Sequence, residues 1–191
     1  MPINVPILLT WLRILLIPLF VGVFYVPVSL LTLQEKNLLG AAIFAVAAAT
    51  DWLDGYLARA LGQTSAFGAF LDPVADKLMV AAALIVLVHL NRTESWIAVV
   101  IIGREITISA LREWMAQLGA SRSVAVSFIG KLKTAAQMVA IVLLLYFDNL
   151  FQLIDAAMIG EKLMWIAAIL TLWSMAYYLR MAWPQLKDHA N

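Results

Sequence analysis

The sequence predicts an all-α integral membrane protein with six transmembrane helices and a short N-terminal interfacial segment. Of its 191 residues, 64% are hydrophobic and only 13% are charged, and the mean hydropathy is +0.92. Soluble domains have a lower apolar content. The apolar residues also form stretches long enough to cross a bilayer, which takes about 20 residues. The polar stretches between them are too short for a separate domain, so residues 1–191 are expected to form one membrane-embedded domain.

The first spanning helix is expected at residues 12–31, with Pro18 inside it. Residues 1–11 are apolar but contain two prolines, so we expect them to form the interfacial segment. No Lys or Arg precedes Arg13, so the basic start of a secretory signal is missing. The polar sequence QEKN at 34–37 then separates the first span from the second.

Five further apolar stretches follow, each bounded by polar or glycine-containing segments such as NRTES and GASRSVAVS. The second stretch contains many small side chains, which allow neighbouring helices to approach closely in lipid. The expected spans are residues 38–60, 69–90, 96–118, 129–147 and 163–181.

Acidic side chains gather between the second and third spans, in TDWLDGYLARALGQTSAFGAFLDPVADK. Asp51 and Asp54 lie one helical turn apart, as do Asp72 and Asp76, so each pair occupies one helix face. An antiparallel helix pair would bring the four carboxylates to one membrane face. Unpaired carboxylates are costly in an apolar setting, and a divalent cation, or two, would remove that cost. Oxygen ligands favour Mg²⁺ or Mn²⁺ over zinc, and the chain has no Cys.

The basic residues are distributed unevenly between the ends of these spans. Alternating the spans across the membrane places Lys36, Arg92 and Lys162 on one side and the other ten of the 13 Lys and Arg on the other. Basic residues are enriched on the cytoplasmic side of membrane proteins. The sequence therefore predicts a multi-pass membrane protein with both termini and the acid cluster facing the cytoplasm.

The acid segment matches D-x2-D-G-x2-A-R-x8-G-x3-D-x3-D at every fixed position, and in this respect the chain resembles the CDP-alcohol phosphotransferases. The resemblance covers essentially the whole chain and is strongest to the bacterial phosphatidylglycerophosphate synthases. Outside the signature it rests on Asn4, Pro6, Thr10, Arg13, the segments 104–105, 111–113 and 130–134, and Gln137.

The resemblance implies transfer of a phosphatidyl group from CDP-diacylglycerol to sn-glycerol 3-phosphate, giving phosphatidylglycerophosphate and CMP. It implies two divalent cations, Mg²⁺ or Mn²⁺, bound by the four Asp, with Asp76 also acting as the base. It also implies a homodimer in the lipid bilayer of the bacterial cytoplasmic (inner) membrane. The implied contacts to CDP-diacylglycerol are Asn4, Thr10, Asp54, Gly55, Arg59, Thr64 and Gly68. Since the acceptor carries a phosphate dianion, the candidates for binding it are Arg104, Arg112, Lys131 and Lys133.

Other interpretations of these residues are possible from the sequence. The same chemistry could use another alcohol, such as inositol phosphate, serine or phosphatidylglycerol, and acids in a membrane could instead belong to a cation transporter. Arg104 could simply pair with the neighbouring Glu105, and Lys131 and Lys133 could be ordinary cytoplasmic anchors. Lys77 is expected to pair with an acid such as Glu105 or to extend toward the membrane surface.

Overall fold

The computed structural model contains six α-helices and two very short strands in the residues that it describes. It describes the backbone of residues 5–60, 66–117, 128–150 and 154–188. Side chains are described in these ranges except at 5, 6, 52, 54–60, 66, 69, 128, 129, 131, 150, 154 and 184–188. The elements are α1 (Val5–Tyr25), α2 (Leu33–Ala60), α3 (Ala66–His89), α4 (Ser95–Gln117), α5 (Phe128–Tyr146), β1 (Asn149–Leu150), β2 (Ile154–Asp155) and α6 (Ala156–Asp188).

The six helices confirm the all-α prediction, but the ends of α1 and α6 differ from it. Residues 5–11 are the first turns of α1 rather than a separate interfacial segment. Pro6 permits this because an N–H group in the first turn has no partner within the helix anyway. Helix α6 extends beyond the expected 163–181 at both ends, and the antiparallel pair β1–β2 precedes it.

Capping side chains explain where two of the helices begin. The Thr32 hydroxyl and backbone N–H donate to Glu35 at 2.7 and 2.8 Å, while the Glu35 N–H donates to the Thr32 hydroxyl at 3.3 Å. This reciprocal arrangement is a capping box, and its hydrogen bonds hold the pKa of Glu35 below its usual value. At α6, the Asp155 carboxylate accepts a hydrogen bond from the Met158 N–H at 3.0 Å. Because of the capping box, the polar residues 34–37 belong to the first turns of α2.

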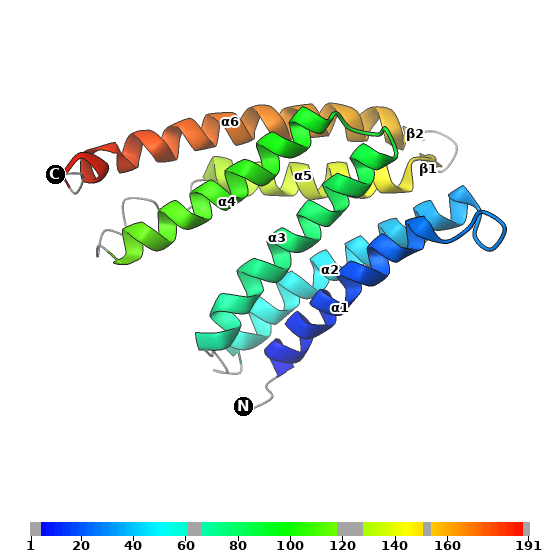
Figure 1. Ribbon diagram of the computed structural model, residues 1–191, viewed down its shortest axis with the longest axis horizontal. Helices are drawn as coiled ribbons and strands as arrows, with labels where there is room; N and C mark the ends of the chain where they lie inside the picture. Colours follow the sequence, from blue (N-terminus) through cyan, green and yellow to red (C-terminus); the bar gives the residue numbers. More distant parts are fainter. Residues whose placement is uncertain (1–4, 61–65, 118–127, 151–153, 189–191) are drawn as a thin grey trace.

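The helices form two groups, α1–α3 and α4–α6, as Figure 1 shows. Helix α1 packs against both α2 and α3, while α6 packs against both α4 and α5. The groups meet where α3 contacts α4 and where α2 and α3 contact α5. In Figure 1 the two groups diverge: α1 begins near the end of α2 and the start of α3, at the bottom of the view, and α6 ends separately at the left, both on the side opposite β1 and β2. We call this side the terminal end and the opposite one the far end.

One hydrophobic core contains residues from all six helices. Its fully buried members include Phe20, Phe44, Leu84, Ile101 and Ile141. Two glycines lie where a neighbouring helix leaves no room for a side chain. A Cβ atom at Gly160 of α6 would lie 2.9 Å from Leu144 Cγ of α5, and one at Gly40 of α2 would overlap the Phe24 ring of α1. These close contacts help to fix the helix pairs toward the far end.

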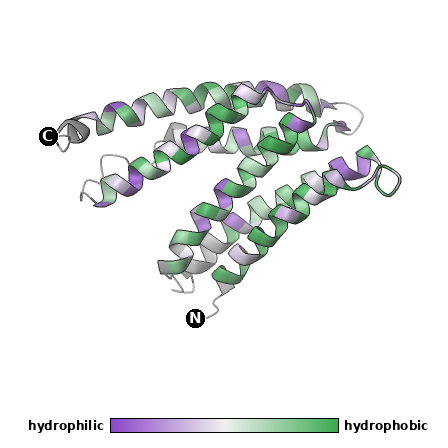
Figure 2. Ribbon diagram, in the orientation of Figure 1, coloured by the Kyte–Doolittle hydropathy of each residue, from purple (hydrophilic) through white to green (hydrophobic). Residues whose placement is uncertain are grey.

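The outer surface of the helices is strongly apolar. Large side chains such as Leu15, Leu30, Trp173 and Trp183 are between 66% and 75% exposed. Figure 2 shows hydrophobic residues along every helix, interrupted by hydrophilic positions. Among the described residues, two helices, at Ile7–Tyr25 and Ala156–Trp183, are long and apolar enough to cross a membrane.

Arg92 joins the two helix groups at the far end. Its guanidinium donates to the backbone carbonyls of Leu144 and Leu145 at 3.0 and 2.9 Å and to the Asn37 side chain at 2.7 Å. It also lies 4.2 Å from the ring centroid of Phe147. Burial lowers the pKa of Arg92 to about 10, so the group remains charged at neutral pH.

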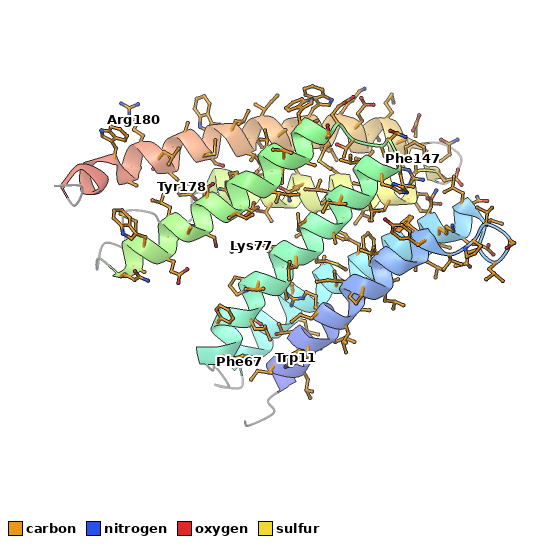
Figure 3. The ribbon with its side chains drawn as sticks, viewed as in Figure 1. Trp11, Phe67, Lys77, Phe147, Tyr178 and Arg180 are labelled. Atoms are coloured by element: carbon orange, nitrogen blue, oxygen red, sulfur yellow. The ribbon has the colours of Figure 1, made fainter. Side chains whose placement is uncertain are left out.

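Replacing Arg92 by glutamine is expected to lower the free energy of unfolding in detergent by about 3 kcal/mol, because buried carbonyls lose a charged donor. Thermal unfolding of purified protein measures this. The matched control is Arg180→Gln, since Arg180 is an exposed residue on the outer side of α6 (Figure 3). Equal unfolding midpoints for the two variants would contradict a structural role for Arg92.

Candidate functional site

The acid signature lies where α2 ends and α3 begins. Asp51 is in the last part of α2, and Asp72 and Asp76 are in the first half of α3, so the described members face the terminal end of the fold. Gly68 is buried in the first turns of α3. The side chains of Asp54 and Arg59, like Gly55, lie outside those that the structure describes, and so do Asn4 and Thr64.

Helix α1 provides polar partners for both acid stripes. The Arg13 guanidinium, only 1% exposed, donates to Asp51 Oδ1 at 2.6 Å. One turn earlier, the buried Thr10 hydroxyl donates to Asp72 Oδ1 at 2.5 Å. The sequence suggested Thr10 as a contact of the nucleotide lipid, whereas the structure places it on a carboxylate of the signature. One acid of each stripe, Asp51 and Asp72, is therefore held by a side chain of α1.

Asp76 lies deeper along α3 than Asp72. It lines a cavity of about 10 Å³ together with Arg13, Phe44 and Met138. It is also within electrostatic reach of Asp51 on α2. Asp51 and Asp76, one from each acid stripe, therefore lie within electrostatic reach of each other.

The residues present fit a hard divalent cation by their chemistry. The described acids of the signature supply carboxylate oxygens, next to the Thr10 hydroxyl, and these are the ligands that Mg²⁺ and Mn²⁺ prefer. Within the described side chains, no three His or acidic residues lie close enough together to hold a metal ion. The suitability of the site for a divalent cation is therefore argued from the oxygen donors and from the electrostatic interaction between Asp51 and Asp76.

A second polar cluster lies between α4, α5 and α6. Lys133 of α5, 1% exposed, forms an ion pair with Glu105 of α4, and Arg104 donates to the same carboxylate oxygen at 3.2 Å. Arg104 also donates to the Ser174 hydroxyl at 3.2 Å. Arg112, two turns further along α4, donates to the Tyr178 hydroxyl at 3.1 Å. Three of the four predicted acceptor-binding cations thus share one cluster, and the Lys131 side chain is not described.

This cation cluster keeps hydrogen-bonding capacity for an anion. Within the described part of the chain, the Nε atoms of Arg104 and Arg112 are buried and have no hydrogen-bond partner. Each is a charged donor, and such donors bind phosphate strongly. Lys133 is too deeply buried to be the surface anchor that the sequence left open.

The acids and the cations adjoin one another. Asp76 interacts electrostatically with both Glu105 and Lys133. Lys77, next to Asp76, donates a hydrogen bond to Ser109 on α4 and interacts electrostatically with Glu105, the acid suggested as its partner. Figure 3 shows Lys77 midway along α3. The two helix groups therefore meet between the carboxylates and the cations.

Comparison with known proteins identifies the family. A family model described as CDP-alcohol phosphatidyltransferase matches residues 3–173. The chain belongs to the CDP-alcohol phosphatidyltransferase family. Two curated relatives, from Shigella flexneri serotype 5b (strain 8401) and Escherichia coli (strain K12), are each 52% identical over 191 residues, covering 98% of this chain and 100% of the relative. Both are named CDP-diacylglycerol–glycerol-3-phosphate 3-phosphatidyltransferase.

Several contacts in this CDP-alcohol phosphatidyltransferase were not predicted from the sequence. They are the Arg13–Asp51 pair, the Thr10–Asp72 hydrogen bond, and the contacts of Ser174 and Tyr178 with the two arginines. Ser174 and Tyr178 are one turn apart on α6, which was a signal in the sequence. Neither residue is charged or belongs to the signature, so this spacing alone does not indicate a site.

Proposed function

We propose that this chain transfers the phosphatidyl group of CDP-diacylglycerol to sn-glycerol 3-phosphate, yielding phosphatidylglycerophosphate and CMP. The observation that carries the proposal is its relation to enzymes named for this reaction, at 52% identity over 98% of the chain. The site supports it chemically, because carboxylates suited to a divalent cation adjoin cations suited to a phosphate.

The proposed setting is the bacterial cytoplasmic membrane, with residues 1–191 as one domain and all six helices spanning. The apolar outer surface and the position of both chain ends on the side opposite β1 and β2 support this arrangement. The excess of Lys and Arg that the expected topology places on one side of the membrane favours a cytoplasmic orientation for the site and both termini. The homodimer implied by the family resemblance is part of the proposal.

For the metals, we propose that Asp51, Asp54, Asp72 and Asp76 together hold two divalent cations, Mg²⁺ or Mn²⁺. Bound there, the cations would neutralise the pyrophosphate and the charge that develops on the departing CMP. Gly55 and Gly68 leave room beside the same stripes, and Arg59, Thr64, Asn4 and Thr10 complete the proposed contacts to CDP-diacylglycerol.

Asp76 is the proposed base. Its carboxylate accepts the proton of the glycerol 1-hydroxyl as that oxygen attacks the phosphorus that carries the diacylglycerol. The bond between this phosphorus and the oxygen bridging it to the cytidine phosphate breaks, and CMP leaves with the bond electrons. Arg104, Arg112, Lys131 and Lys133 bind the acceptor phosphate and hold the hydroxyl in position. The proximity of Lys133 to Asp76 supports this assignment.

The test is CMP release from CDP-diacylglycerol by the purified protein in mixed micelles. Release is expected only when both sn-glycerol 3-phosphate and Mg²⁺ or Mn²⁺ are present, and a chelator is expected to abolish it. Equal CMP release with inositol phosphate or serine would contradict the assignment of sn-glycerol 3-phosphate as the acceptor. Metal flux into liposomes that contain the protein, with no CMP release under any condition, would favour a cation transporter over an enzyme.

A further inference from the structure

Tyr178 of α6 lies against both arginines of the cation cluster. Its hydroxyl accepts a hydrogen bond from Arg112 Nη2 at 3.1 Å. The ring centroid is 5.1 Å from the Arg112 guanidinium carbon and 5.7 Å from that of Arg104. Both distances are within the reach of a cation–π interaction. Figure 3 shows Tyr178 on the side of α6 that faces α4.

The ring itself is held firmly. Tyr178 is only 1% exposed and belongs to a small apolar cluster with Ile108, Met115 and Ala182. A side chain packed in this way has little freedom to change rotamer. The position of the ring therefore constrains the positions of the two guanidinium groups.

This arrangement keeps two like charges near one another. Arg104 and Arg112 lie two helical turns apart on one face of α4, and the electron-rich ring offsets part of their repulsion. The Tyr178 hydroxyl takes one donor from Arg112, and the Ser174 hydroxyl takes one from Arg104. The buried Nε donors of both arginines remain available. The pair is thus preorganised for one anion with several oxygens.

We infer that Tyr178 is a positioning residue that holds Arg104 and Arg112 together for the acceptor phosphate, and so sets the preference for a phosphorylated over an unphosphorylated alcohol. The inference rests on the proposed function for the identity of the acceptor. Tyr178 lies beyond residues 3–173, the stretch that matches the family model. A role in acceptor choice, rather than in the chemistry common to the family, agrees with that location.

The experiment compares Tyr178→Phe and Tyr178→Leu with the wild type. Phenylalanine removes only the hydroxyl, and leucine also removes the aromatic face. The matched control is Tyr177→Phe, because Tyr177 is the neighbouring tyrosine but is 48% exposed. The KM for sn-glycerol 3-phosphate is expected to rise about tenfold in Tyr178→Phe and about 50-fold in Tyr178→Leu. The kcat and the KM for CDP-diacylglycerol are expected to stay within about twofold, because neither the base nor the acid signature is altered.

Two further readouts separate positioning from general damage. The ratio of kcat/KM for glycerol 3-phosphate to that for glycerol is expected to fall in the Tyr178 variants and to stay unchanged in Tyr177→Phe. Calorimetry measures the binding of inorganic phosphate to the purified wild type and to each variant. The Tyr178 variants are expected to bind phosphate more weakly than the wild type, by about the same factors as the KM rises. An unchanged selectivity ratio, or equal losses for both substrates, would overturn the inference.

The failure of this inference differs from the failure of the proposed function. If the wild type uses no glycerol 3-phosphate, the proposed function fails, and phosphate binding still decides whether Tyr178 organises an anion site. Equal phosphate affinity in the wild type and Tyr178→Phe would reject the role of the hydroxyl whatever the acceptor is. Equal affinity in Tyr178→Leu as well would reject the role of the ring.

Discussion

Replacing Asp76 by asparagine is expected to reduce kcat by at least about 1,000-fold, while CDP-diacylglycerol still binds. The amide keeps the shape of the side chain but cannot accept the proton of the attacking hydroxyl. General-base catalysis contributes about 100- to 10,000-fold, and loss of a metal-binding carboxylate adds to this. Single-turnover CMP release measures the chemical step, and equilibrium binding of labelled CDP-diacylglycerol measures the retained affinity.

Asp155→Asn is the matched control for this variant. Asp155 is an exposed aspartate at the far end of the fold, where it caps α6, and asparagine caps a helix equally well. It should turn over at the wild-type rate. If Asp76→Asn loses the binding of CDP-diacylglycerol as well, Asp76 acts mainly as a ligand rather than as the base. A kcat within tenfold of the wild type would remove Asp76 from both roles.

Lys133→Gln is expected to raise the KM for sn-glycerol 3-phosphate about 10- to 100-fold. Lys133 is a buried cation in contact with Glu105, and a hydrogen bond to a charged group contributes about 1.5–3 kcal/mol. Without the ammonium group, Glu105 keeps Arg104 as a partner, so the carboxylate competes with the acceptor phosphate for that guanidinium. Steady-state kinetics with each substrate varied in turn measure the effect.

The matched control is Lys162→Gln, because Lys162 is exposed. This variant is expected to leave the KM for sn-glycerol 3-phosphate and the KM for CDP-diacylglycerol unchanged. Adding Glu105→Gln to Lys133→Gln should restore part of the affinity for the acceptor, because the competing carboxylate charge is removed. A purely structural ion pair predicts something different: lower thermal stability in Lys133→Gln with an unaltered KM for glycerol 3-phosphate. That result would take Lys133 out of the acceptor site.

Hydropathy alone was enough to predict six helices, because each apolar stretch is long and separated from the next by polar residues. The ends of α1 and α6 were harder to predict. Pro6 suggested a break, but a proline in the first turn of a helix removes no hydrogen bond. At the start of α6, the polar residues 161–162 suggested a loop, although the Asp155 cap begins the helix before them. Local composition is a weaker signal there than capping.

For the site, helical spacing predicted which acids share a face, since spacing within one helix depends only on helix geometry. It could not predict contacts between helices, which depend on packing. Arg13 contacts Asp51 because of the position at which α1 packs along α2. Tyr178 contacts two arginines because of the position at which α6 packs along α4. The hydrogen bond from Lys77 to Ser109 was not predicted for the same reason.

The polar contacts between α4 and α6 also fix how far one helix is shifted along the other. The two helices run in the same direction (Figure 1), with Trp96 beside Trp165, Arg104 beside Ser174 and Arg112 beside Tyr178. In lipid, apolar faces give little reason to prefer one sliding position over another, because a leucine gains similar contacts from acyl chains. A shift of one turn would take both guanidinium groups away from their acceptors. The hydrogen bonds that would organise the proposed phosphate site therefore also select a single register for the two helices.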